Sequence, residues 1–271
     1  MRYLPREDAP FSQRIWQQID AAVIGAAKSQ LAGRRILHIE GPLGLGTRSL
    51  EQEERLAKGE ATFAGARAAM TAPRAIPVPL IYAEFELPIR EVAAAEERGS
   101  PLDLAKAANA AIACARLEDA VIFQGEKALG LEGLLTVEGA SRVKLGDWSQ
   151  VGQPLEDLIK AVDALGGAGF PGPYAAALAP APFNALFRVY EDSNLTQMEH
   201  VRQMITAGLA KAPTLPSGGL VSAAGKQFAS ILLAQDMTPA YVGPAGPNYA
   251  FVVLESLCAR IPVPQAICVL G

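Results

Sequence analysis

The chain has 271 residues, of which 50% are hydrophobic and 19% are charged, so a disordered or highly charged polymer is excluded. Its 24 basic and 28 acidic residues give a net charge of −4, without the cationic excess that nucleic-acid binding requires. The 2 histidines and 3 cysteines are a small supply for metal sites or for acid–base catalysis near neutral pH.

The composition also bears on the compartment. Residues 1–8 carry acidic side chains and no continuous apolar stretch, unlike a secretory signal. The longest apolar runs, such as Tyr174–Pro182, are far shorter than the ~20 residues that span a bilayer. An odd number of cysteines does not suggest a disulfide framework. We therefore expect a cytoplasmic protein without a membrane segment.

Two long helices dominate the first half of the chain. Ser12–Arg35 carries apolar residues at spacings of three and four, with Ser12 as the expected N-cap and Gly33 as a left-handed end. Asp103–Gly125 has a broad, alanine-rich apolar stripe that includes Cys114 and Leu117, which suggests close packing of this helix on a sheet.

Between these helices, Pro77–Pro88 alternates apolar and polar residues as a half-buried strand does. Its three prolines keep it away from the centre of a sheet. We interpret it as one arm of a long extended excursion whose other arm is the preceding segment, because Thr47–Ala75 lacks strong periodicity.

The second half of the chain mixes helices and strands. This order favours an α+β fold over a doubly wound nucleotide-binding sheet. The predicted helices are Leu155–Leu165, Pro182–Val189 and Thr196–Ala207, and the predicted strands are Tyr174–Leu178, Gly219–Ala223, Ala229–Ala234, Asn248–Glu255 and Ala266–Leu270.

Each candidate for chemistry has a stronger structural interpretation. Glycines 41, 44 and 46 have the reverse spacing of a dinucleotide-binding loop and follow no strand that feeds a helix. His38 is either strand-borne or pocket-lining, and His200 is expected on a helix surface. Glu118 and Asp119 project about 100° apart on their helix, which suits solvation or subunit contacts better than paired acid catalysis. We predict no enzyme, no metal site and no cofactor.

Four patches resemble the encapsulins, which are shell proteins with the Hong Kong 97-type phage capsid fold. No single patch is diagnostic, but they occur in the right order over nearly the whole chain. They are Gln30–Arg35 leading into Glu40–Gly44; Glu96–Gly99 followed by Leu117–Gly125 and Gly130–Leu135; Gly172–Tyr174; and Gln235–Asp236, five residues before Tyr241. The chain departs at Leu45–Gly46, where the family usually has Trp-Glu.

The resemblance implies an α+β capsid fold with a peripheral domain, an axial domain and an extended loop. The corresponding ranges are 1–44 for the N-terminal helix and the start of the peripheral domain, 45–90 for the extended loop, 91–148 for the peripheral domain with its spine helix, 149–233 for the axial domain, and 234–271 for the return strands of the peripheral domain.

It also implies a function. Encapsulins are closed icosahedral compartments of sixty copies or a multiple, which enclose cargo enzymes such as ferritin-like proteins or dye-decolourising peroxidases. Cargo carries a short targeting peptide that docks in a groove near the N-terminal helix. By position, the candidates for this groove are Leu31, Arg34, Ile36, His38 and Ile39. Alternatively, these residues only pack the helix on its sheet. The family often has an acid at the position of His38.

A pore loop is expected at Tyr190, Glu191, Asp192, Ser193 and Asn194, between the two axial helices. Five copies of its two acids around one axis would favour cations; the alternative is an ordinary solvated turn. For the whole chain, the alternative to an encapsulin is a tailed-phage or prophage major capsid protein, and a small α+β enzyme is a third hypothesis. Neither nucleic acid nor a membrane is an expected partner.

Overall fold

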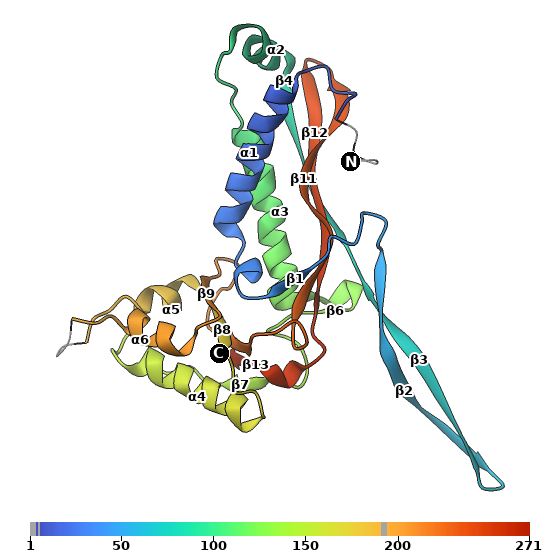
Figure 1. Ribbon diagram of the computed structural model, residues 1–271, viewed down its shortest axis with the longest axis vertical. Helices are drawn as coiled ribbons and strands as arrows, with labels where there is room; N and C mark the ends of the chain where they lie inside the picture. The colour runs from blue at the N-terminus through green and yellow to red at the C-terminus, as the bar shows by residue number, and fades with distance from the viewer. Residues whose placement is uncertain (1–3, 5, 191–193) are drawn as a thin grey trace.

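The computed structural model describes residues 4, 6–190 and 194–271; for 52–63, 67, 69–72 and 74 it describes the backbone alone. Three parts are visible in Figure 1: a long sheet backed by two helices, a second sheet with three helices beside it, and a two-stranded hairpin that projects away from both.

The long sheet has four strands in the order β1–β11–β12–β4. Its first strand, β1, runs parallel to β11, and the other neighbours are antiparallel. The strands are β1 (His38–Glu40), β11 (Ser230–Ala245), β12 (Asn248–Arg260) and β4 (Leu80–Pro88). Strands β11 and β12 are longer than the apolar runs predicted, because the strands continue past irregularities in their pairing.

Helices α1 (Gln13–Gln30) and α3 (Ala105–Gln124) lie side by side on one face of this sheet (Figure 1). The predicted stripe of α1 is buried at Trp16, Ile19, Val23 and Ala27, in one cluster with Phe251 of β12. In α3, small residues such as Ala107, Ala111 and Cys114 are buried in the same cluster, which permits the close approach that the sequence suggested. Leu117, predicted to be apolar core, is instead 50% exposed.

The end of α1 differs from the prediction. The helix ends at Gln30 rather than Arg35, because Leu31 leaves the helical conformation with ψ of 111°. A short 3-10 helix, η1 (Gly33–Arg35), follows, and Gly33 is not left-handed. A Cβ atom on Gly33 would lie 2.9 Å from Cδ1 of Ile122. Glycine is therefore needed here for close packing against α3 rather than for a left-handed turn.

The hairpin consists of β2 (Ser49–Phe63) and β3 (Ala66–Pro77), which pair antiparallel along most of their length. The interpretation of Pro77–Pro88 as one of its arms is wrong. Residues 80–88 form β4 and pair with β12 at an edge of the four-stranded sheet, where prolines are tolerated. Both arms come instead from the segment that lacked periodicity.

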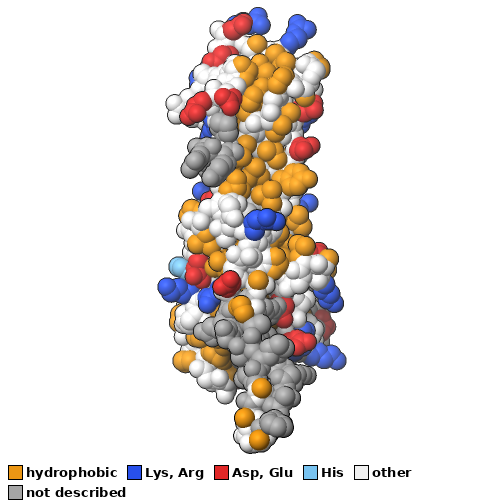
Figure 2. All heavy atoms as spheres, turned by 90° about the vertical axis from the view of Figure 1, so that its right-hand side faces the viewer, with side chains coloured by type: hydrophobic (Ala, Val, Ile, Leu, Met, Phe, Trp, Pro, Cys, Tyr) orange, Lys and Arg blue, Asp and Glu red, His pale blue; other side chains and the backbone are white. Residues whose placement is uncertain are grey.

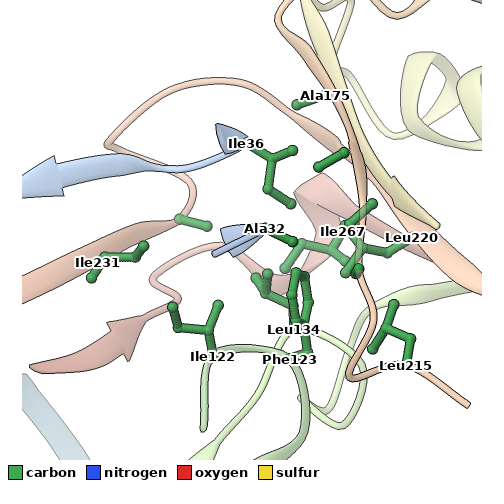
Figure 3. Packing of buried hydrophobic residues seen from close by; sticks show 14 of the residues in the cluster. Ala32, Ile36, Ile122, Phe123, Leu134, Ala175, Leu215, Leu220, Ile231 and Ile267 are labelled. Carbon is green, nitrogen blue, oxygen red and sulfur yellow. The ribbon is translucent and has the colours of Figure 1, made fainter. Parts of the chain in front are cut away.

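The second sheet has five strands in the order β7–β13–β10–β8–β9. They are β7 (Ser141–Val143), β13 (Ile267–Leu270), β10 (Gly219–Ala223), β8 (Tyr174–Leu178) and β9 (Gly208–Lys211). Alternate residues of β8, β10 and β13 enter two different cores. Ala175, Leu220 and Ile267 face the cluster drawn in Figure 3, with Phe123 of α3 and Ile36. Ala176, Val221 and Cys268 belong to a cluster with Leu158 and Leu165 of α4.

The remaining elements are short. Helices α4 (Gln153–Gly167), α5 (Pro180–Ala185) and α6 (Gln197–Met204) accompany the five-stranded sheet, and α2 (Ile89–Arg98) follows β4. Both α5 and α6 end before their predicted limits of Val189 and Ala207. Between α3 and β7 lie β5 (Gly125–Glu126), η2 (Lys127–Leu129) and β6 (Leu131–Glu132), and η3 (Pro264–Ala266) precedes β13. Strand β13, the last strand of the chain, pairs with β10 and so belongs to the five-stranded sheet, not to the sheet that contains β11 and β12.

In the described part of the chain, no helix lies over the side of β4 that points away from α1 and α3 (Figure 1). Strand β4 buries Ile81, Phe85 and Leu87, whereas Tyr82 is 61% exposed and Leu80 is 53% exposed. Figure 2 shows hydrophobic side chains gathered along the upper part of this side of the molecule. The outer side of β4 is thus open to solvent and carries Leu80 and Tyr82 beside two glutamates, whereas Leu232 and Cys258 of the neighbouring strands are buried in a cluster with Ile76 at the base of the hairpin.

Candidate functional site

Arg34, one of the five groove candidates, lies at the centre of a cluster of charged side chains. The guanidinium donates to both carboxylate oxygens of Glu118, with Nε–Oε1 at 2.7 Å and Nη2–Oε2 at 2.8 Å. It also donates to Asp236 (Nη1–Oδ1 2.7 Å) and to Glu255 (Nη2–Oε2 3.2 Å). One side chain of η1 therefore ties together α3, β11 and β12.

The charged groups of this cluster interact strongly, because most of them are buried away from water. Glu118 and Glu255 are fully buried, whereas Asp236 has 59% of its side chain exposed. Burial raises the pKa of Glu255 to about 10, and the adjacent carboxylate of Glu118 adds to the rise. Burial opposes the charge of Arg34, but the hydrogen bonds and charges of Glu118 and Asp236 outweigh it, so its pKa lies above the ordinary value. The cluster holds more carboxyl groups than cations, and a proton on Glu255 relieves the excess.

Asp119, next to Glu118, fixes the turn after α1. Its carboxylate accepts backbone N–H groups from Ala32 (2.9 Å to Oδ2) and Gly33 (2.9 Å to Oδ1). Burial raises the pKa of Asp119 to about 6, although these two N–H groups act in the opposite direction. The two orphan amides at the start of η1 are thereby satisfied in the interior.

The prediction that Glu118 and Asp119 are solvated or at a subunit contact is therefore wrong. Both are fully buried within one subunit. The sequence did contain a signal: they lie four residues after Cys114 and Ala115, which belong to the apolar stripe of the same helix. Acids at such positions require buried partners, and Arg34 and the amides of residues 32 and 33 supply them.

The five groove candidates do not form one open surface. Leu31 and Ile36 are buried in two different hydrophobic clusters. Arg34 is occupied by its carboxylates. The remaining two, His38 and Ile39, lie on β1 and are exposed, Ile39 at 36%. His38 is thus strand-borne and also lines a shallow hollow, so both interpretations of this residue hold.

The residues of the expected pore loop follow α5 and precede α6 in the chain. Glu191, Asp192 and Ser193 are outside the described residues, so only Tyr190 and Asn194 of the five can be placed. A bridge between Val189 and Thr196 closes the loop at its base, and the Tyr190 ring meets the His200 ring edge-on at 5.4 Å between centroids. Thr196 and Glu199 form a capping box at the start of α6. The apolar side chains of Phe187, Val189 and Leu195 are exposed beside the loop.

The described residues give little support for metal binding, reactive thiols or a membrane span. Among the residues that the structure describes, no group of three or more His, Cys, Asp or Glu side chains is arranged to hold a metal ion. Cys114, Cys258 and Cys268 are buried and unbridged, and burial raises the pKa of each thiol to between about 11 and about 12. No helix in the described part of the chain is long and apolar enough to cross a bilayer.

Solved structures with this fold are capsids and virus-like particles. A virus-like particle from Pyrococcus furiosus matches with a TM-score of 0.72 at 21% identity, over 95% of this chain and 99% of that one. The capsid of Myoviridae phage XM1 matches with a TM-score of 0.58 at 13% identity, over 86% and 88%. The fold is therefore the HK97-type capsid fold, as the sequence patches implied.

Sequence relatives identify the family. The Linocin_M18 family model, described as encapsulating protein for peroxidase, matches residues 1–258. The type 1 encapsulin shell protein EncA of Myxococcus xanthus is 35% identical over 99% of this chain and 96% of its own length. A diheme-cytochrome-encapsulin shell fusion protein of Kuenenia stuttgartiensis is 32% identical over 94% of this chain and 72% of its own.

The chain belongs to the type 1 encapsulin shell proteins, a family of structural proteins that form homo-oligomeric nanocompartments around cargo. Membership of this family confirms the prediction of a shell protein rather than an enzyme.

Proposed function

We propose that copies of this chain form an icosahedral shell of sixty subunits or a multiple of sixty, which encloses an enzyme through a short targeting peptide. The observation that carries the proposal is the pair of surfaces that one subunit leaves uncovered. The hairpin β2–β3 projects from the body (Figure 1), and the outer face of the four-stranded sheet is apolar and exposed at Leu80 and Tyr82. Such surfaces are stable in water when a second copy covers them.

In this assembly the part with the four-stranded sheet and helix α3 serves as the peripheral domain with its spine helix, and residues 149–233 form most of the axial domain. The axial assignment is supported by Phe187 and Val189, whose apolar side chains are exposed between α5 and α6. Symmetry-related copies around an axis would cover them. Residues 49–77 serve as the extended loop.

The enclosed enzyme is a dye-decolourising peroxidase or a ferritin-like protein. The description of the matching family model as an encapsulating protein for peroxidase supports the first. A ferritin-like-encapsulin shell fusion protein of Pyrococcus furiosus, 26% identical over 72% of this chain and 52% of its own length, supports the second. The encapsulin would have no catalytic group of its own, in keeping with buried cysteines and few histidines.

The targeting peptide docks along β1. His38 and Ile39 would contact it directly, because they are exposed on this strand. Leu31, Arg34 and Ile36 would hold the strand in place from beneath, through the core and the charge cluster. The groove would thus divide into two contact residues and three supporting residues.

Loop 190–194 lines a pore on the five-fold axis. Five copies of Glu191 and Asp192 around that axis would attract cations. Replacement of both by Gln and Asn should slow the entry of ferrous iron into shells loaded with a ferritin-like protein. Unchanged uptake, measured by iron absorbance over time, would show that ions enter elsewhere.

A cytoplasmic cargo compartment also fits better than a phage capsid. The phage capsids resemble this chain in fold at 10–14% identity, whereas EncA is 35% identical over almost the full length. The net charge of −4 provides no general attraction for packaged DNA.

Two measurements test the proposal. Electron microscopy of the protein expressed alone should show uniform hollow particles without DNA; a soluble monomer or dimer would contradict the assembly. Mass spectrometry of shells purified from the cells that naturally make them should identify an enclosed peroxidase or ferritin-like protein. Deletion of the terminal segment of that protein should then abolish its enclosure, and unchanged enclosure would rule out docking by a targeting peptide.

A further inference from the structure

A shallow hollow lies beside β1. Its volume is about 390 Å³, and it forms where three segments meet: the turn into β1, the residue before β9, and the loop between β10 and β11. The residues that line it are Arg35, Ile36, Leu37, His38, Ala207, Ala224, Gly225 and Lys226.

The charges around this hollow are of one sign. Arg35 and Lys226 are cationic, and none of the described residues that line the hollow is acidic. In the described part of the chain neither cation lies within salt-bridge distance of a carboxylate, although the charge of Arg35 acts against the rise in the pKa of the buried Asp119. A neighbouring hollow of about 430 Å³, which includes Thr206 and Gly208, likewise has a cation, Arg202, and no acid among its described lining. On a chain with a net charge of −4, this is a local reversal of sign.

Arg35 is in contact with its neighbours through both its side chain and its backbone. Its Nη2 donates to the carbonyl of Lys28 at 2.9 Å, in the last turn of α1. Gly208 packs directly beneath, because a Cβ atom there would lie 2.6 Å from the carbonyl oxygen of Arg35. Ile36 is buried in the core. One hydrogen bond therefore orients the exposed guanidinium, which reduces the entropy lost on binding.

The hollow continues into an edge of the sheet. Strand β1 is the end strand of the four-stranded sheet and pairs with β11 on one side. A strand in this position presents backbone groups to an added extended segment, and the exposed Ile39 offers it an apolar contact. A peptide that lies along His38–Glu40 would reach the cations at the start of β1.

We infer that this hollow is the subsite that binds an acidic residue of the cargo's targeting peptide. The inference rests on the proposed docking along β1 and adds the chemistry of the partner: an Asp or Glu side chain, or a terminal carboxylate, between Arg35 and Lys226. A peptide fits better than nucleic acid, because the cationic surface is confined to a short hollow next to an apolar contact and a strand edge.

A pooled competition tests this. A fluorescent protein is given a library of 12-residue C-terminal tags that vary in apolar pattern and in charge, together with an untagged version. The pool is expressed with the full-length shell protein, the shells are purified, and the enclosed tags are quantified by mass spectrometry. We expect tags with Glu or Asp to be enriched over the matched Lys tags by roughly threefold to tenfold, the scale of one or two exposed ion pairs.

The variant Lys226→Glu should cancel or reverse this order, whereas Lys106→Glu, an exposed lysine of α3 away from the hollow, should preserve it. Enclosure that depends on apolar pattern but not on charge would overturn the acidic subsite and leave the groove intact. A pool in which no tag exceeds the untagged protein would overturn both. Loss of assembly in Lys226→Glu would assign the hollow to a subunit contact, and RNA that co-purifies with wild-type shells but not with this variant would assign it to nucleic acid; either overturns the inference.

Discussion

The two large sheets of this encapsulin use their faces differently. In the five-stranded sheet, every residue of β8, β10 and β13 is buried, because one set of alternate side chains packs with α3 and the other with α4. In the four-stranded sheet, β4 has one buried face and one face on which Leu80 and Tyr82 are exposed. Strands β8, β10 and β13 are thus covered on both faces within one subunit, whereas the outer side of β4 keeps apolar side chains exposed.

The covered face of the four-stranded sheet also differs chemically, since it ends in the Arg34 cluster. Loss of that cation should have the largest effect. Arg34→Met would leave Glu118 and Glu255 buried with no cation between them, so we expect the free energy of unfolding to fall by about 3–5 kcal/mol. Denaturant titration of disassembled subunits measures this.

Arg90→Met is a suitable control, because Arg90 is exposed on α2 and should change stability by less than about 0.5 kcal/mol. Addition of Glu118→Gln to Arg34→Met should recover part of the loss, since it removes the carboxylate that Arg34 contacts through two hydrogen bonds. Equal stability of Arg34→Met and the wild type would show that the cluster does not hold η1 on α3.

Leucines in the two sheets provide a direct comparison. Leu220→Ala on β10 removes a fully buried side chain from the core in Figure 3 and should lower the free energy of unfolding by about 2–5 kcal/mol. Leu80→Ala on β4 makes the same chemical change at a 53% exposed position and should lower it by less than about 1 kcal/mol in disassembled subunits. Similar losses in both variants would mean that the outer face of β4 is covered within one subunit.

This difference between the sheets also explains which strands could be predicted from the sequence. Tyr174–Leu178 and Gly219–Ala223 were predicted with their observed limits, because strands buried on both faces are short apolar runs. The alternation of β4 was recognised, but alternation gives no partner, and the strand was assigned to the wrong hairpin. The true hairpin projects from the body (Figure 1), and a segment outside a half-buried sheet need not alternate apolar and polar residues.

Sites were harder to predict than strands. Arg34, Leu31 and Ile36 were singled out by family position, and the structure gives them supporting contacts inside the subunit. The buried acidic partners of Arg34 are more than eighty residues away in the sequence, so no local pattern could pair them with it. The hollow beside β1 was missed for the same reason, because Arg35 and Lys226 meet only through the fold.

The free energy of unfolding should also depend on pH, through a buried glutamate on the covered face of the four-stranded sheet. The folded subunit raises the pKa of Glu255 to about 10, chiefly by burial. Between the ordinary glutamate pKa of about 4.5 and this value, the folded state therefore binds more protons than the unfolded state, and stability falls as pH rises. Glu255→Gln keeps the neutral form at every pH, so its advantage over the wild type should grow by up to about 4 kcal/mol between pH 6 and pH 9, at about 1.4 kcal/mol per pH unit.

Thermal unfolding of both proteins across this pH range measures the difference. Glu84→Gln, an exposed position on the outer face of β4, should follow the wild-type pH dependence. Parallel curves for the wild type and Glu255→Gln would indicate that Glu255 is already ionised at pH 6.

The open face of β4 should matter for assembly more than for folding. Tyr82→Ser removes a side chain that is 61% exposed in the subunit, so the free energy of unfolding should change by less than about 1 kcal/mol. If a neighbouring copy covers this side chain, the variant loses an aromatic interface contact, and the subunit concentration needed for reassembly should rise at least about tenfold. Light scattering during reassembly measures this threshold, with Glu84→Ser on the same exposed face as the matched control. A Tyr82→Ser variant that folds and reassembles like the wild type would show that this apolar face stays in contact with solvent in the finished shell, and the five-stranded sheet would then differ from its neighbour in burial without any consequence for assembly.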